Sequence, residues 1–438
     1  MNNSIGCFEA AWLFIWNLIK NSLIYKFLKA VYEGISDAWR KSRIAGWFRR
    51  LHTEEGALEK TVAGRIVRSP FTFLEFLQKK FGARLAEAIE NSSVLELCRE
   101  YLNNLLAINL RFIGYLLFVT SAGLILGQMA GHQKVGWVLL GGVALGAVLT
   151  FFDVNVTDYL KGSAAAGLIC RLLGIEPDFN WYDKRYTRGK ERLLSAVFFG
   201  AAAGLLGGWV NPLFAPALII GFAAVFLVLK FPSAGVFFVV FAAPVAPTMA
   251  DVGLALLSIF SLALYSVTHK GFKFKFDGIG FFIIVFLGVY AVAAITSFAM
   301  MNSFSIWAIY FVFISIYFVI INTVNTKKLL MNLLTVFVLS GFLVCLYGVA
   351  QYVFGWDTAQ AWMDEEMFSD IKMRIYSTLG NPNVLGEYIL LVLPASVGLM
   401  WVNKRFEAKV VYAAVSALMF GALILTFSRG CWIGIMAG

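Results

Sequence analysis

A succession of long apolar stretches constrains the fold of this chain more than any other feature. A helix of roughly 20 apolar residues crosses the hydrocarbon core of a bilayer, because it satisfies its backbone hydrogen bonds internally. About eleven stretches of such length occur, and a further apolar run begins at Cys431. We therefore predict an all-α, polytopic transmembrane helix bundle with about eleven complete spans and the start of a twelfth. The stretches are 112–130, 135–152, 193–210, 212–229, 232–249, 252–268, 279–300, 304–321, 329–354, 384–402 and 410–427.

Composition supports a lipid environment. Hydrophobic residues make up 60% of the chain and charged residues 14%, which is too few charges for the water-facing surface of a 438-residue globular protein. The five cysteines show no CxxC spacing and do not cluster with the three histidines. We therefore expect no disulfide framework, no metal site and no cofactor.

The distribution of basic residues predicts the orientation. If the N-terminal region is cytoplasmic and the chain changes side at every span, only Lys134, Lys372, Arg374 and Arg429 of the 36 Lys and Arg residues lie outside. This asymmetry follows the positive-inside rule. The net charge of +10 then faces anionic cytoplasmic lipid, and nucleic acid is not needed to explain it.

Two polar regions are predicted to stay on the cytoplasmic side. Residues 1–111 mix apolar and basic residues at helical spacing, which predicts amphipathic helices that bind membrane lipids or partner proteins. Residues 153–192 contain an apolar piece at 163–173 that is too short to cross, so we expect an interfacial segment. The region 112–354 is predicted to hold the first nine transmembrane helices, and this segment follows the second of them.

Glycines at small-xxx-small spacing predict close helix packing. Such pairs let two helix backbones approach each other inside the bilayer. They occur at Gly123 and Gly127, at Gly142 and Gly146, and at Gly200, Gly204 and Gly208.

The longest external loop, 355–383, is the best candidate for a functional region. It carries the densest external charge, and the incomplete segment 384–438 follows it. Its charged residues are Asp357, Asp364, Glu365, Glu366, Asp370, Lys372 and Arg374.

The end of this loop combines an arginine with a predicted helix start. Turn residues at 380–383 lead into the next span, and Asn383 is a candidate cap for its first turn. The positive end of that helix dipole, together with Arg374, would suit a phosphate or pyrophosphate. The alternative is a plain turn and cap. Glu387, about one turn inside the helix, is expected to face a polar cavity or to pair with an arginine.

A second external arginine lies in the segment Thr426–Gly430. Arg429 adjoins Gly430 at the predicted membrane surface, where snorkelling is the alternative to a binding role. Because Arg374 and Arg429 are exceptions to a strong charge rule, we expect them to bind a ligand, and a diphosphate is the obvious candidate.

These residues carry a resemblance to a known family. The pattern Arg-x-x-Ser-Thr-Leu-Gly-Asn-Pro-Asn-x-Leu-Gly from Arg374 to Gly386, and Leu-Thr-Phe-Ser-Arg-Gly from Leu425 to Gly430, resemble the O-antigen ligase and polymerase family in order and spacing. The resemblance covers about the last seventy residues. The earlier spans resemble the family only in hydropathy, and the first hundred or so residues lie outside it.

The resemblance implies an enzyme of the bacterial cytoplasmic membrane. It implies transfer of a glycan from an undecaprenyl-diphosphate-linked donor to a glycan, lipid or protein acceptor on the external face, without a metal. Arg374 and Arg429 would hold the diphosphate as leaving group. Asn381, Asn383, Glu387 and Ser428 would line the substrate pocket. The family also places a histidine that assists the acceptor in a later external loop, so we expect this chain to be a fragment of a longer protein.

Two other classes remain open. A transporter or lipid-linked glycan flippase would also have many spans, and it would need polar or broken helices near the middle of the bilayer. A scaffold protein anchored by its spans would leave the two external arginines without a role.

Overall fold

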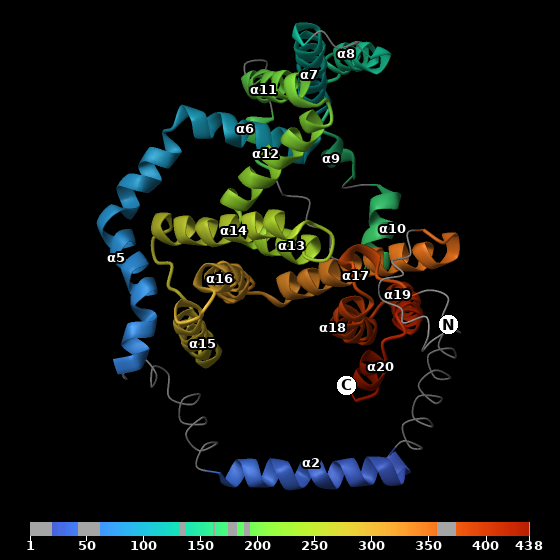
Figure 1. Ribbon diagram of the computed structural model, residues 1–438. Helices are drawn as coiled ribbons and strands as arrows, with labels where there is room; N and C mark the ends of the chain where they lie inside the picture. Colours follow the sequence, from blue (N-terminus) through green and yellow to red (C-terminus); the bar gives the residue numbers. More distant parts are fainter. Residues whose placement is uncertain are drawn as a thin grey trace. The chain divides into compact units, whose positions relative to one another are not determined.

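The computed structural model describes residues 20–42, 62–131, 136–160, 163–173, 182–187, 193–356 and 374–437. Over these ranges the regular structure is helical and contains no strand, apart from one antiparallel bridge between Asn109 and Asn155, so the all-α prediction is confirmed for this part of the chain. The helices, shown in Figure 1, are α2 (Leu23–Lys41), α5 (Val62–Glu90), α6 (Ser93–Ala107), α7 (Leu110–Ala130), α8 (Trp137–Leu149), α9 (Val156–Leu160), α10 (Ala164–Leu173), η1 (Lys184–Tyr186), α11 (Leu194–Val210), α12 (Phe214–Lys230), α13 (Pro232–Ala242), α14 (Thr248–Thr268), α15 (Gly278–Ile295), α16 (Met300–Thr323), α17 (Lys327–Phe354), η3 (Ser377–Leu379), α18 (Pro382–Val402), α19 (Phe406–Leu425) and α20 (Arg429–Ala437).

Seven of the described helices are long and apolar enough to cross a membrane, which supports a membrane protein. Four other predicted stretches contain shorter apolar helices: α8, α11, α12 and α13. The count of eleven spans therefore stays a prediction. The seven long helices are α7, α14, α15, α16, α17, α18 and α19.

The chain forms two compact units. One contains Met1–Thr72 with Phe276–Val289, and the other contains Phe73–Lys275 with Tyr290–Gly438. The first unit includes α2, whose N-cap Ser22 accepts a hydrogen bond from the amide of Tyr25. Exposed apolar side chains recur along α2 at every fourth residue, at Phe27, Val31, Ile35 and Trp39. This periodicity agrees with the predicted amphipathic helix.

In the second unit, α6 packs against the apolar helices. The hydroxyl of the fully buried Tyr101 donates to the carbonyl of Ile219 in α12, at 2.9 Å. The short helix α10, in the predicted interfacial segment, is similarly held, because the hydroxyl of Tyr412 in α19 donates to the carbonyl of Leu173 at 2.9 Å. Both contacts join segments predicted to be cytoplasmic to helices predicted to enter the membrane.

The predicted span 232–249 is interrupted in the structure. Helix α13 ends at Ala242 and α14 begins at Thr248, with Pro244 and Pro247 between them. Proline has no amide hydrogen and disfavours a helical conformation in the residue before it, so two prolines three residues apart stop the helix. The 11 residues of α13 extend only about 16 Å, which is much less than the hydrocarbon core. The structure therefore replaces the expected continuous helix over 232–249 by a short helix and a break.

Side chains from distant helices satisfy the carbonyls at this break. The Ser340 hydroxyl of α17 donates to the carbonyl of Phe241 at 2.8 Å, and the Thr378 hydroxyl donates to the carbonyl of Pro244 at 2.5 Å. Carbonyls that a helix break leaves without intrahelical donors need such partners wherever water is excluded. The break is therefore held on one side by the segment that contains Arg374.

The predicted glycine packing is confirmed between α7 and α11. A Cβ added at Gly127 would meet the Cα of Gly208 at 2.7 Å, and one added at Gly204 would meet the carbonyl oxygen of Thr120 at 2.5 Å. Only glycine permits this backbone approach, and van der Waals contact between the two helices replaces contact with lipid.

Helices α17 to α20 form the main apolar core of the second unit. Figure 1 shows α18 and α19 next to α17, and α20 packs on α18 and α19; buried side chains from all four helices form this core. Fully or almost fully buried members include Val344, Leu385, Ile389, Met419 and Leu423. This core carries the two sequence motifs.

Candidate functional site

The structure brings the two motif segments together. The amide of Ile375 donates to the carbonyl of Leu425 at 3.2 Å, and Nε of Arg374 donates to the carbonyl of Thr426 at 2.9 Å. The end of the predicted external loop therefore lies against the turn between α19 and α20. Two motifs that are separated in sequence by most of α18 and by α19 form one local structure.

The same arginine also contacts the start of α18. Nη2 of Arg374 donates to Oδ1 of Asn383 at 3.1 Å, and the amide of Asn383 donates to Oδ1 of Asn381 at 2.8 Å. Asn381, with extended backbone, is the N-cap of α18, and Pro382 occupies the first helical position. The predicted cap at Asn383 is thus two residues off, because proline is favoured at the first helical position and the cap precedes it.

A buried glutamine that the sequence analysis missed forms hydrogen bonds with the end of the loop. Oε1 of Gln351 in α17 accepts the amides of Tyr376 at 3.3 Å and Ser377 at 3.1 Å. The hydroxyl of Ser377 in turn donates to the carbonyl of Val344 at 2.6 Å. A signal was present in the sequence, since a glutamine inside an otherwise apolar span is costly unless it has partners.

Both motifs contain backbone in the left-handed region. Ser377 has φ of 52° and Phe427 has φ of 51°, and only one other non-glycine residue in the described ranges, Ile108, has a positive φ. L-residues pay about 1 kcal/mol or more for this conformation, and bulky residues adopt it rarely. Such strain concentrates at functional sites, where the surrounding structure enforces it.

Helix α20 approaches α18 closely at Gly386. A Cβ at Gly386 would lie 2.6 Å from Sγ of Cys431, so the glycine of the first motif makes room for the second. The hydroxyl of Ser428, which is buried, donates to Sγ of Cys431 at 3.2 Å, and Cys431 approaches the carbonyl of Asn383. The N-terminal turns of α18 and α20 therefore meet beside Arg374.

The charges of the site differ in their burial. Arg374 is half-buried, and this burial lowers the pKa of its guanidinium from the ordinary value because desolvation disfavours the charged form. Arg429 is the first residue of α20 and has an exposed side chain, and Glu387 in α18 is exposed as well. The hydrogen bonds above join Arg374, Asn381 and Asn383, and they do not include Arg429 or Glu387.

Most of the predicted external loop, residues 357–373, lies outside the described residues, and so do its acidic residues and Lys372. No cluster of metal-ligating side chains occurs among the residues that the structure describes. Comparison of the chain with protein-family models, with curated proteins and with solved structures found no match.

Proposed function

We propose that this chain is a membrane glycosyltransferase that polymerises or ligates cell-surface polysaccharide. It transfers a glycan from an undecaprenyl-diphosphate-linked donor to a glycan, lipid or protein acceptor on the external face of the bacterial cytoplasmic membrane. The observation that supports this proposal best is the contact of Arg374 with both Thr426 and Asn383, which unites the two motifs that resemble the O-antigen ligase and polymerase family.

The local geometry suits a diphosphate. Two helix N-termini meet here, those of α18 and α20, and each presents the positive end of a dipole. Two arginines accompany them, Arg374 held in place by its neighbours and Arg429 exposed at the start of α20. A diphosphate leaving group carries charge that such fixed donors stabilise more in the transition state than in the ground state.

In the proposed reaction the bond between the anomeric carbon and the diphosphate oxygen breaks, and a bond from the same carbon to an acceptor hydroxyl forms. The guanidinium groups of Arg374 and Arg429 stabilise the negative charge that develops on the diphosphate. The acceptor's proton passes to a base. Asn381, Asn383 and Ser428 shape the surface around the diphosphate, and Glu387 lies at its edge.

Arginine substitutions test the proposal. In the full-length protein, reconstituted with a polyprenyl-diphosphate-linked glycan, Arg374→Ala should lower transfer about a hundredfold, and Arg429→Ala should lower it by a similar order. Arg374→Lys should keep the charge and still lose about tenfold, because lysine cannot make the paired contacts.

Arg111 provides a matched control. It also donates to a carbonyl and to a side-chain oxygen, those of Thr150 and Asp153, at 3.2 and 2.9 Å. Arg111→Ala should leave transfer unchanged. Normal transfer by the double variant Arg374→Ala/Arg429→Ala would remove the basis of the proposal.

The orientation belongs to the same proposal. With the N-terminus in the cytoplasm, the apolar face of α2 lies on anionic membrane lipids while its basic residues face the headgroups. A protease added to right-side-out vesicles should then leave an N-terminal tag intact. Cleavage of the tag under those conditions would reverse the topology and place Arg374 inside.

A second candidate function, a transporter or lipid-linked glycan flippase, is favoured by two observations. The break between α13 and α14 and the buried Asp251 in the first turn of α14 supply the interrupted helix and the buried charge that such proteins need. Movement of a labelled lipid-linked glycan across proteoliposomes that contain no acceptor would favour this candidate over the transferase.

A further inference from the structure

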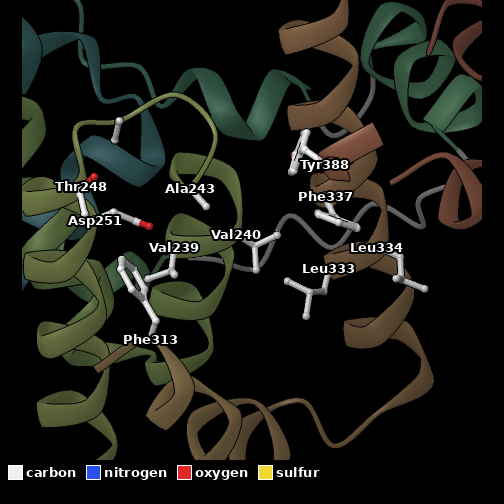
Figure 2. Close-up of a pocket in the computed structure, with 11 residues that line it drawn as sticks. Val239, Val240, Ala243, Thr248, Asp251, Phe313, Leu333, Leu334, Phe337 and Tyr388 are labelled. Carbon is white, nitrogen blue, oxygen red and sulfur yellow. The ribbon is translucent and has the colours of Figure 1, made fainter. Parts of the chain in front are cut away.

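A cavity of about 600 Å³ lies beside the break between α13 and α14. Figure 2 shows its walls, which come from α13, α14, α16, α17 and α18. The walls are mainly apolar and aromatic, with Val239, Phe313, Phe337 and Tyr388 among them. A cavity of this volume accommodates a small organic molecule of mainly apolar character.

One carboxylate faces this apolar space. Asp251 is only 4% exposed, and its Oδ1 atom is buried without a hydrogen-bond partner. In Figure 2 the carboxylate points inward among the wall residues. Because buried polar atoms are almost always paired, a buried carboxylate oxygen that has no protein donor is a candidate acceptor for a donor group of a ligand.

Asp251 lies in the first turn of α14. Asp251 is also the only charged residue among the residues that line the cavity. A lone carboxylate in apolar surroundings pairs best with a cationic ligand group that donates hydrogen bonds, and it disfavours phosphate or carboxylate ligands.

We propose that this cavity binds a hydrophobic amine, with the ammonium group paired to Asp251 and the apolar body against the aromatic walls. An ammonium donates the hydrogen bond that Oδ1 lacks, and the faces of Phe313, Phe337 and Tyr388 attract a cation as well as apolar surface. A bare metal ion fits less well, since a single carboxylate provides few of the oxygen ligands it requires. This inference rests on the cavity alone and is independent of glycan transfer.

Dansylcadaverine, a fluorescent primary amine with an apolar ring, tests the proposal in nanodiscs that contain the full chain. We expect saturable binding with a blue-shifted emission. Its N-acetyl derivative has the same body without the charge and should bind at least about tenfold more weakly. Asp251→Asn, which keeps the shape of the side chain, should weaken binding of the amine about tenfold and leave that of the acetylated probe unchanged.

Two further variants complete the design. Ala246→Leu adds volume to the cavity wall and should weaken binding of both probes. Glu407→Gln removes an exposed carboxylate at the start of α19 and should change neither. Equal binding of the two probes to the native chain, an unchanged affinity for the amine in Asp251→Asn, or a signal that does not saturate would each overturn the proposal.

Discussion

The motif site around Arg374 and the cavity around Asp251 use buried polar groups in opposite ways. At the motif site, Gln351, Ser377, Asn381 and Arg374 each make a hydrogen bond within the protein. In the cavity, Oδ1 of Asp251 makes none. Both places are next to irregular backbone, and the Thr378 hydroxyl connects them by its bond to Pro244.

This difference separates two uses of buried polar groups in one helical protein. Polar atoms that are satisfied by the protein fix a backbone conformation, here the left-handed Ser377 and Phe427 and the starts of α18 and α20. A polar atom that the protein leaves without a partner stabilises nothing by itself, so its contribution depends on what enters from outside. Removing a polar group should therefore have opposite effects on stability at the two places.

The largest effect is expected at Gln351. Gln351→Leu removes the oxygen that accepts the amides of Tyr376 and Ser377, and lipid cannot replace it. The free energy of unfolding should fall by about 3 kcal/mol, measured from the unfolding transition in detergent. Gln351→Glu keeps an acceptor oxygen and should lose less than Gln351→Leu. An equal loss of unfolding free energy in the two variants would show that the acceptor oxygen at position 351 does not stabilise the fold.

An intermediate effect is expected at Gly386. Gly386→Ala places a Cβ against Sγ of Cys431, which should destabilise the packing of α20 on α18 by about 2 kcal/mol. The double variant Gly386→Ala/Cys431→Ala should recover part of this loss, because the sulfur is gone. At Gly398, in the same helix, an added Cβ meets no atom within 4 Å, so Gly398→Ala is the matched control and should be neutral.

The smallest effect, and the one of opposite sign, is expected at Asp251. Asp251→Leu removes a buried carboxylate that lacks a partner at Oδ1, so the unfolding free energy should rise by about 1 kcal/mol while binding of the amine is lost. The same unfolding measurement in detergent decides the sign. A clear loss of stability would show that Asp251 is held by the protein after all, and the contrast between the two places would fail.

Hydropathy predicted the helices well and their interruptions poorly. The runs that became α7, α16, α17, α18 and α19 are long and mainly apolar, and a helix satisfies the backbone of such a run in lipid without outside partners. The run 232–249 is equally apolar, yet it stops at Ala242. Hydropathy is a property of side chains. The break depends on the missing amide hydrogens of Pro244 and Pro247 and on donors from Ser340 and Thr378 to the carbonyls of Phe241 and Pro244.

The candidate site was predictable in part. Arg374, Asn381 and Asn383 were selected from the sequence, and the structure joins them by hydrogen bonds. Gln351 and Cys431 were missed, because their partners come from distant segments and no local pattern marks them. The roles assigned to Arg429, Glu387 and Ser428 stay predictions.

The glycine contact between α7 and α11 also sets an order of events during synthesis. Helix α7 leaves the ribosome first, and α8, α9 and α10 are made before α11 emerges. Because translation proceeds at about 5–20 residues per second, several seconds pass between the synthesis of α7 and that of α11, and the glycine face of α7 has no partner during that time. Pausing or slowing translation in the segment before α11 would lengthen that wait and expose α7 to the wrong neighbour, so codon choice there bears on the yield of correctly assembled protein.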